Sequence, residues 1–320
     1  MRQFYAFNGD ADGLCALQQL RLAEPGEAVL VTGVKRDIQL VRRVDAASGD
    51  RLTVLDVSLD QNRQEVADLL DRGVAIRYFD HHFAGALPDR GDFTSYIDTA
   101  PDVCTSVLVD RQLGGRYRQW AIAAAFGDNL PKVGASMAAA AGLDEETVVT
   151  LRDLGTYLNY NAYGETIADL HFDPHALAEL IYPFEDPIAF VSESDTYVAL
   201  REGYAADMER ARALTPLSQV PGATMMLLPD AAWAKRAIGV FANELARALP
   251  GTALAILSPN AAGGFVVSLR VPPEAIVGAD EFCRRFDTGG GRRLAAGINR
   301  LPHGDMDRLA AAFQSCYGRH

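Results

Sequence analysis

The sequence predicts an α/β protein with an N-terminal, doubly wound, largely parallel sheet domain, a smaller C-terminal α/β domain and a cleft between them. Strand-like and helix-like stretches alternate over the first 130 residues, which is typical of a parallel sheet covered on both faces. The 320 residues are enough for two domains. A hydrophobic fraction of 49% and a charged fraction of 22% are those of an ordinary globular protein.

The elements are predicted from short apolar runs bounded by Gly, Asp or Asn and from apolar residues at helical spacing. The predicted strands are residues 4–7, 28–34, 52–57, 74–79, 223–228, 253–257 and 265–271. The predicted helices are residues 14–22, 61–72, 231–248, 279–286 and 305–317, and residues 103–208 are expected to be mostly helical. We place an N-terminal domain at residues 1–190, a helical connector at 191–215 and a C-terminal domain at 216–320.

Charge and composition exclude several classes of protein. A formal net charge of −12 argues against binding long duplex DNA, because such binding leaves a basic footprint. The four cysteines have no C-x-x-C spacing, so we expect reduced thiols rather than disulfides or a zinc site. We find no secretory signal pattern and no apolar run of about 18 residues. We therefore expect a cytoplasmic protein that makes no membrane contact.

Acidic side chains follow three of the predicted strands. Asp10 and Asp12 come directly after the first strand, Asp56 lies at the end of the third, and Asp80 follows the fourth. The carboxyl ends of parallel strands meet at one edge of a sheet, where ligands bind. Two carboxylates this close repel each other unless a cation or proton compensates them, and Mg²⁺ and Mn²⁺ prefer oxygen ligands. The pattern therefore predicts a divalent metal site.

Two of the six histidines, His81 and His82, directly follow Asp80 at this edge. Neighbouring residues of an extended chain point to opposite sides, so one histidine can bind metal while the other faces a substrate. Asp80 can orient an imidazole ring by a hydrogen bond. Asp128 follows an apolar helix that opens into a loop, and it joins the candidate ligands.

A glycine run with adjacent arginines predicts a phosphate contact in the C-terminal half. The run is Gly289-Gly290-Gly291, and Arg292 and Arg293 follow it. Backbone amides without side chains can approach an anion closely, and arginine can bind phosphate through two hydrogen bonds. Together with the acidic edge, this run favours a metal-dependent phosphoester hydrolase.

Other polar residues are open to more than one interpretation. Lys35 and Arg36 end the second predicted strand at the acidic edge and are candidates for a phosphate contact. Tyr160 or Tyr163 could stack on a base, although packing between helices is preferred. Thr105 and Ser106 are interpreted as caps of a helix.

Taken together, these residues resemble the DHH phosphoesterase superfamily. The matching positions are Asp10 and Asp12 for its first motif, Asp56 for the second, Asp80-His81-His82 for the third and Asp128 for the fourth. The glycine run resembles the signature of the C-terminal domain in one branch of the superfamily. That branch contains nanoRNases, 3′-phosphoadenosine-5′-phosphate phosphatases, cyclic-dinucleotide hydrolases and single-strand exonucleases.

The resemblance covers the chain from Asn8 to Gly297, with two departures. Arg292 stands where the signature usually has histidine, at a position that contacts the substrate rather than the metal. Arginine keeps a phosphate contact but cannot both donate and accept a proton as imidazole does. Asn8 stands where exonuclease-like relatives have an acid.

The resemblance implies hydrolysis of phosphoester bonds in nucleotides or short single-stranded oligonucleotides by a water between two Mn²⁺ ions, with Mg²⁺ as the other candidate. The implied ligands are Asp10, Asp56 and His81 for one ion and Asp12, Asp56 and Asp128 for the other. His82 would bind or protonate the reacting phosphate, Asp80 would act with it, and Arg292 would stabilise the phosphate charge.

Two other functions fit part of the pattern. The sequence Asp-x-Asp-Gly also resembles the nucleophile loop of haloacid-dehalogenase-like phosphatases, with Asp10 as covalent nucleophile, but that function leaves the histidines and the glycine run unexplained. A non-catalytic nucleotide-binding regulator would keep the same ligands. The substrate stays open among short RNA, 3′-phosphoadenosine-5′-phosphate, a cyclic dinucleotide and single-stranded DNA. The oligomeric state, including a homodimer, is also open.

Overall fold

The computed structural model describes residues 1–319 and divides the chain into two compact units, Met1–Glu202 and Gly203–His320. The division falls within α9 (Asp195–Arg212), a helix of 18 residues. Within residues 1–319, no helix is both long enough and apolar enough to cross a membrane.

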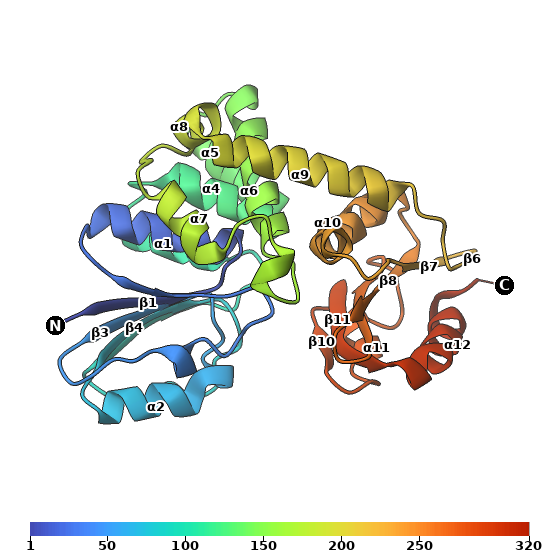
Figure 1. Ribbon diagram of the computed structural model, residues 1–320, viewed down its shortest axis with the longest axis horizontal. Helices are drawn as coiled ribbons and strands as arrows, with labels where there is room; N and C mark the ends of the chain where they lie inside the picture. The colour runs from blue at the N-terminus through green and yellow to red at the C-terminus, as the bar shows by residue number, and fades with distance from the viewer. Residues whose placement is uncertain (320) are drawn as a thin grey trace. The chain divides into compact units, whose positions relative to one another are not determined.

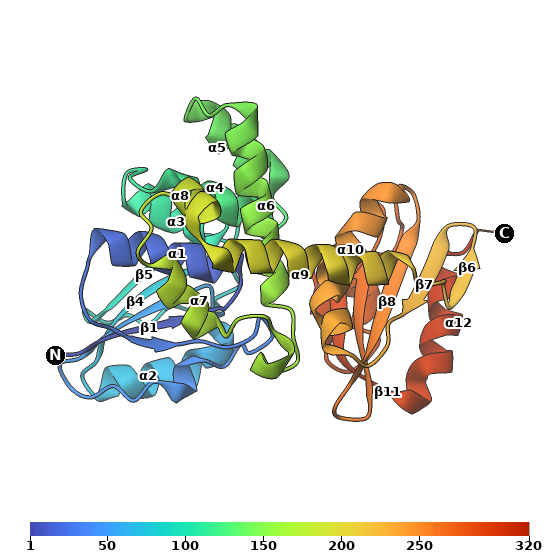
Figure 2. The ribbon, with the colours of Figure 1, turned by 45° about the horizontal axis from the view of Figure 1, so that its top comes forward.

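The first unit is built on a five-stranded sheet whose neighbouring strands all run parallel, in the order β2-β1-β3-β4-β5. The strands are β1 (Gln3–Phe7), β2 (Val29–Val31), β3 (Arg51–Leu55), β4 (Ala75–Asp80) and β5 (Phe93–Ile97). Figures 1 and 2 show α1 (Ala11–Ala23) on one face of this sheet and α2 (Arg63–Asp71) on the other. The predicted doubly wound α/β fold is confirmed.

The strands bury two separate cores, one on each face of the sheet. Phe7, Leu55 and Phe79 pack in the core on the α1 side, whereas Phe4 and Tyr78 pack in the core on the α2 side. Side chains of a strand alternate between faces, so a strand covered on both sides is apolar throughout. This is why uninterrupted apolar runs predicted these strands.

The register of the sheet aligns the ends of three strands. Phe7 is paired with Leu55, and Leu55 is paired with Phe79. After β1 the chain continues into α1 on one face, and after β3 it continues toward α2 on the other. In parallel sheets, ligands bind at the carboxyl ends of strands where the connections diverge in this way. The residues that follow β1, β3 and β4 therefore meet at one edge.

Helices supply the rest of the first unit, and the mostly helical character predicted for residues 103–208 is confirmed. These helices are α3 (Thr105–Gln112), α4 (Arg118–Gly127), α5 (Pro131–Ala140), α6 (Glu145–Asn161), α7 (Pro174–Ile181) and α8 (Pro187–Glu193). In Figures 1 and 2 they lie on the same side of the sheet as α1. Their largest fully buried side chain is Trp120 of α4.

Two glycines allow α4 to approach α6 and α1 closely. A Cβ atom on Gly155 would lie 1.9 Å from the backbone oxygen of Ala123, and a Cβ atom on Gly127 would lie 2.5 Å from the Cβ of Ala11. A larger residue at either position would force the helices apart. The close approach places Asp128, at the carboxyl end of α4, beside the first turn of α1.

The second unit contains a six-stranded sheet in the order β10-β11-β9-β8-β7-β6, in which only β7 and β8 run parallel. The strands are β6 (Ser218–Val220), β7 (Ala223–Leu227), β8 (Ala253–Asn260), β9 (Gly264–Arg270), β10 (Gly289–Gly291) and β11 (Ala295–Pro302). Helix α10 (Ala232–Ala248) packs against β8 and β9. Helices α11 (Ala279–Cys283) and α12 (Met306–Tyr317) bury Phe282 and Phe313 in the core with the strands.

The sequence patterns miss β5, β6, β10 and β11. The side chains of β5 are mostly half-buried at the sheet edge, so its residues do not form an apolar run. Strand β10 consists of three glycines, which have low strand propensity.

The capping interpretation of Thr105 and Ser106 is wrong, because the N-cap of α3 is Cys104 and makes no side-chain capping bond.

We expect Gly155→Ala to lower the free energy of unfolding by about 2 kcal/mol, because overpacking of this kind outweighs the gain in helix propensity of about 1 kcal/mol. Urea unfolding followed by circular dichroism measures the change. Gly26→Ala is the matched control, because no atom lies within 4 Å of its Cβ position. Equal stability of the two variants would show that α4 and α6 can move apart without cost.

Candidate metal centre

The first acidic residue of the centre, Asp10, is the N-cap of α1. Its Oδ1 accepts hydrogen bonds from the backbone amides of Asp12 (3.0 Å) and Gly13 (3.1 Å). A Cβ atom on Gly13 would lie 2.1 Å from the backbone oxygen of Asn8, so glycine is required for this tight entry into the helix. The turn from β1 into α1 therefore fixes Asp10 and Asp12 together at the sheet edge.

The carboxylate of Asp12 is held by the first turn of α3. The backbone amides of Thr105 and Ser106 each donate to one of its oxygens over 2.7 Å. The hydroxyl of Ser106 also donates to the backbone oxygen of Asp12 over 2.8 Å. Asp12 therefore supplies from α1 the acceptor that the N-terminus of α3 lacks within its own sequence.

Asp56 takes a left-handed backbone conformation, with φ of 57°. Aspartate and asparagine tolerate this region better than most residues, and such conformations occur often at functional sites. Its amide donates to the backbone oxygen of Phe79 over 3.0 Å. Its Oδ1 accepts from the Thr105 hydroxyl over 3.3 Å. The end of β3 thus directs this carboxylate toward the first turn of α3.

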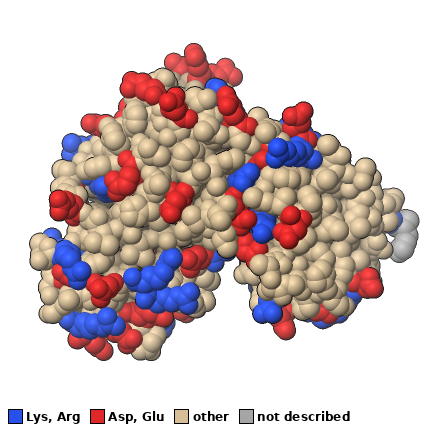
Figure 3. All heavy atoms as spheres, in the orientation of Figure 1, with Lys and Arg blue, Asp and Glu red and all other residues tan. Residues whose placement is uncertain are grey.

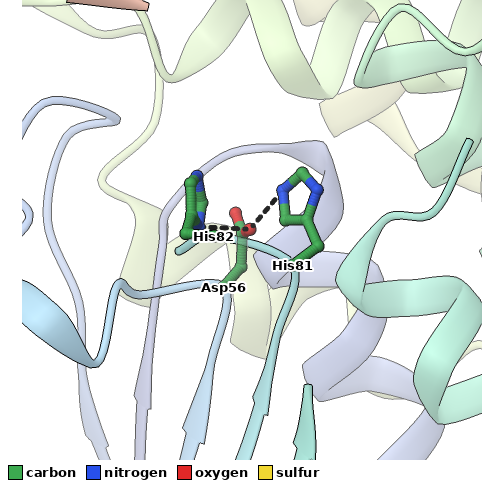
Figure 4. A group of neighbouring side chains, drawn as sticks. All are labelled: Asp56, His81 and His82. Atoms are coloured by element: carbon green, nitrogen blue, oxygen red, sulfur yellow. Dashed lines mark ion pairs between the residues drawn. The ribbon is translucent and has the colours of Figure 1, made fainter. Parts of the chain in front are cut away.

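His81 is buried, and its two ring nitrogens have different partners. Nδ1 lies 3.0 Å from the backbone oxygen of Val103, which can only accept, so Nδ1 carries a proton. Nε2 lies 3.3 Å from Oδ1 of Asp56 and 3.9 Å from Oδ2 of Asp12. A ring nitrogen that faces two carboxylates needs either a proton or a metal ion between them. Figure 4 shows Asp56 between the rings of His81 and His82.

His82 is oriented by Asp80. Its Nδ1 lies 2.7 Å from Oδ1 of Asp80, and the same oxygen accepts the backbone amide of His81 over 2.9 Å. The side chain of His82 is 44% exposed, whereas that of Asp80 is fully buried. Asp80 thus orients the exposed histidine rather than the buried one, which is held by Val103.

Asp128 completes the centre from the C-cap of α4. Its Oδ2 is buried and has no hydrogen-bond partner within residues 1–319. Ligand atoms of Asp12, His81 and Asp128 lie within 4.8 Å of one another, and so do those of Asp56, His81 and His82. Two carboxylates and one imidazole are suitable ligands for a divalent ion, and the unpartnered oxygen of Asp128 is available for such a bond.

Burial and mutual repulsion shift the acidity of these groups. Burial and the nearby Asp56 carboxylate raise the pKa of Asp12 to about 6. Burial and the nearby Asp10 carboxylate raise the pKa of Asp56 to about 6. Burial also raises the pKa of Asp128. Burial opposes the charged form of His81, but its hydrogen bond to Asp56 outweighs this and raises the pKa to about 10. A bound cation would relieve the same repulsion.

No protein-family model matches the chain, and no curated protein matches it. Among solved structures, the exonuclease RecJ bound to manganese matches with a TM-score of 0.63 and 18% sequence identity, over 98% of this chain and 89% of that one. The DHH domain of a member of a family of ribosomal proteins matches with a TM-score of 0.68 and 13% identity, over 98% of this chain and 86% of that one. The chain has the DHH fold.

A third structure with this fold is RecJ in complex with Mn²⁺ from Thermus thermophilus. It matches with a TM-score of 0.58 and 16% identity, over 98% of this chain and 51% of that one. At these identities the likeness establishes the fold. The motifs that resemble the DHH superfamily in the sequence lie at the carboxyl edge of the parallel sheet in this fold.

Lys35 contacts Asp10 in the candidate metal centre, which the sequence patterns did not indicate. Its ammonium group hydrogen-bonds to Oδ2 of Asp10 and to Oδ1 of Asn159, the latter over 3.1 Å. Burial opposes ionisation of Asp10, but the charge of Lys35 outweighs it and lowers the pKa of Asp10. Within residues 1–319, Asp10 belongs to neither group of neighbouring ligand atoms. The other partner of Lys35, Asn159, lies in α6, 124 residues away in the sequence. No local sequence pattern could therefore predict the contacts of Lys35.

The glycine run lies in the second unit, where it forms the edge strand β10. Gly290 pairs with Gly297, and the amide of Arg292 donates to the backbone oxygen of Ala295 over 2.9 Å to close the turn into β11. The guanidinium of Arg293 donates to the backbone oxygen of Ala275 over 3.0 Å. The run is thus a hairpin at a sheet edge, with both arginines in its turn.

We expect Mn²⁺ to raise the melting temperature of the wild-type chain by about 5–10 °C, since a ligand at a hundred times its Kd adds about 2.7 kcal/mol. Asp128→Asn should remove most of this shift and leave the metal-free melting temperature equal or higher, because Oδ2 of Asp128 has no hydrogen bond to lose within residues 1–319.

Differential scanning calorimetry with and without Mn²⁺ measures both quantities. Asp102→Asn is the matched control, because Asp102 is exposed. An equal shift in Asp128→Asn and in the control would exclude Asp128 as a ligand.

Proposed function

We propose that the chain is a metal-dependent hydrolase of phosphoester bonds in nucleotides or short single-stranded oligonucleotides. The observation that carries the proposal is the convergence of Asp12, His81 and Asp128, whose ligand atoms lie within 4.8 Å of one another. A buried, unpartnered carboxylate oxygen costs stability unless a ligand compensates it. One solved structure with this fold is an exonuclease bound to manganese, which supports the same reaction class.

The proposed ligands of the ion are Asp12, Nε2 of His81 and Asp128, and the proposed ion is Mn²⁺. When bound, a divalent ion supplies a Lewis acid that activates a water and takes up charge on the phosphate. Asp12 is fixed for this role by the amides of α3, and His81 by Val103. Asp56 accepts from the Thr105 hydroxyl and faces both histidines, so it keeps their rings in place.

His82 is the proposed acid that protonates the reacting phosphate or the leaving oxygen. Burial opposes its charged form, but the hydrogen bond to Asp80 outweighs this and raises the pKa of His82. Because Nδ1 is held by Asp80, Nε2 is the nitrogen left to donate a proton. Its 44% exposure makes it accessible to a substrate, in contrast to His81.

A pocket lined by the chain neighbours of Lys35 is a candidate position for an anionic part of the substrate. The pocket has a volume of about 320 Å³, and its lining includes three arginines, Arg36, Arg42 and Arg43, and two acids, Asp37 and Glu165. Arg43 pairs with Asp37 over 3.0 Å, whereas Arg36 makes no side-chain hydrogen bond within residues 1–319. In Figure 3, Lys and Arg side chains on the lower part of the first unit are interspersed with Asp and Glu side chains. Arg36 is thus a candidate contact for a phosphate of the substrate.

Covalent catalysis by Asp10 is disfavoured by the hydrogen bonds of this residue. Oδ2 of Asp10 binds the ammonium of Lys35, and Oδ1 accepts the amides of Asp12 and Gly13. Despite the burial of Asp10, the charge of Lys35 also lowers the pKa of this residue, which makes its carboxylate a weaker nucleophile. A stable phosphorylated enzyme intermediate is therefore not expected.

The experiment that tests the function is a product assay with the metal-stripped full chain reloaded with Mn²⁺. The four substrates are a short RNA, 3′-phosphoadenosine-5′-phosphate, a cyclic dinucleotide and single-stranded DNA, with products separated by chromatography. We expect hydrolysis of at least one short substrate and its loss in excess chelator. Turnover of none of them with bound Mn²⁺ would instead favour a non-catalytic nucleotide-binding regulator.

Asp56→Asn should lower kcat by about a hundredfold or more. Asp56 keeps the rings of His81 and His82 in place, and misplacement of catalytic groups by about 1 Å can cost a hundredfold in rate. Asparagine also tolerates the left-handed backbone at this position, so the fold should be retained. Asp102→Asn serves as the control, and circular dichroism checks the fold. A wild-type kcat in Asp56→Asn would show that catalysis does not depend on the candidate metal centre.

Arg292 is proposed to hold a substrate phosphate that does not react, with Gly289-Gly290-Gly291 and Arg293 beside it. A charge-assisted contact is worth about 1.5–3 kcal/mol, so Arg292→Ala should lower kcat/KM roughly tenfold to a hundredfold. The loss should appear mainly in KM if the contact serves binding alone. Arg300→Ala, an exposed arginine of the neighbouring strand β11, is the control. Identical kinetics in the two variants would leave the hairpin with a structural role only.

A further inference from the structure

Both groups of potential ligands within residues 1–319 depend on His81. Nδ1 of this ring donates to the backbone oxygen of Val103, so only Nε2 can bind an ion. One imidazole nitrogen binds one ion at a time. His81 can therefore complete only one of the two groups at a time.

Lys35 is held by its backbone as well as by its side chain. Its amide donates to the backbone oxygen of Ala162 over 3.0 Å, and its backbone oxygen accepts from Nδ2 of Asn8 over 3.4 Å. The ammonium group bonds to Oδ2 of Asp10 and Oδ1 of Asn159, and it lies 5.6 Å from the centroid of the Tyr163 ring. Asn159 is 4% exposed. A buried amide oxygen and the face of an aromatic ring together form a specific binding site for the ammonium group.

Oδ1 of Asp10 accepts the amides of Asp12 and Gly13, so Oδ2, which faces Lys35, is the oxygen that a second ion would have to share with this cation. A divalent ion at Asp10 would have to displace Lys35 or lie beside it, and two cations at that distance repel strongly. Displacement would also leave Oδ1 of Asn159 without its partner in a buried place. The residues at Asp10 therefore do not fit a second ion.

We propose that the ammonium group of Lys35 takes the place of a second divalent ion at Asp10, so that the centre binds one ion per chain. The proposal rests on the metal-dependent hydrolase proposed above and replaces the pair of ions that the sequence resemblance implies. Lys35 then neutralises Asp10 permanently, and the ion neutralises the group around Asp128. The side chain of Lys35 is 25% exposed, so its charge also reaches the solvent side of the centre.

The test counts Mn²⁺ ions per chain in the stripped full-length protein after saturation and gel filtration, by mass spectrometry of the metal and by isothermal titration. Electron paramagnetic resonance of the same samples distinguishes an isolated Mn²⁺ ion from an exchange-coupled pair. The variants are Lys35→Ala, which removes the charge and leaves room, and Lys35→Arg, which keeps the charge. Lys132→Ala on α5 is the control, because Lys132 is exposed.

We expect one isolated ion in the wild type, in Lys35→Arg and in the control, and a second ion in Lys35→Ala. Two ions in the wild type would overturn the proposal, and so would a single ion in Lys35→Ala. If Lys35→Ala does not fold, the wild-type count and the spectrum still decide, because a coupled pair in the wild type leaves no role for Lys35 as a cation.

Hydrolysis is measured on the same samples, so that the two proposals fail separately. A chain that binds one ion but turns over none of the four substrates would overturn the proposed function and leave the role of Lys35 intact. A chain that binds two ions and hydrolyses a substrate would do the reverse.

Discussion

The structure of the first unit depends on compensating negative charge that is buried at one edge of a parallel sheet. Asp10, Asp12 and Asp56 are each no more than 3% exposed. The protein balances them with three kinds of partner, which are the ammonium of Lys35, the ring of His81 and the backbone amides of α3. Each partner comes from a different part of the chain, so the charge of the centre ties these parts together.

The geometry that brings these partners together comes from close backbone contacts rather than from the acidic residues themselves. Gly127 and Gly155 allow α4, α6 and α1 to pack at distances that a side chain would prevent. This packing sets the place of Asp128 at the end of α4 and of Asn159 in α6. The glycines are therefore as important to the centre as its ligands, although they have no side chain that could bind an ion.

The sequence predicted the parallel sheet and its acidic edge, because strands buried on both faces are apolar runs and their ends are marked by Asp10, Asp56 and Asp80. It missed what depends on distant partners. The bond between Lys35 and Asn159 joins residues 124 positions apart, and no spacing rule predicts it. The sequence predicted the glycine run as a phosphate-binding loop. It did not predict that the run is a strand paired with β11, because three glycines form no apolar pattern.

Asp12 and Asp128 would respond differently to the loss of catalysis during evolution. The carboxylate of Asp12 accepts the first amides of α3, so selection for a folded chain alone would retain it. Oδ2 of Asp128 has no such bond within residues 1–319, and its burial is a cost to the fold. In a homologue that had become an inactive binding protein, Asp12 would therefore be retained, whereas Asp128 would be replaced by other residues. Among homologues, the identity of this one residue is the more informative sign of a working centre.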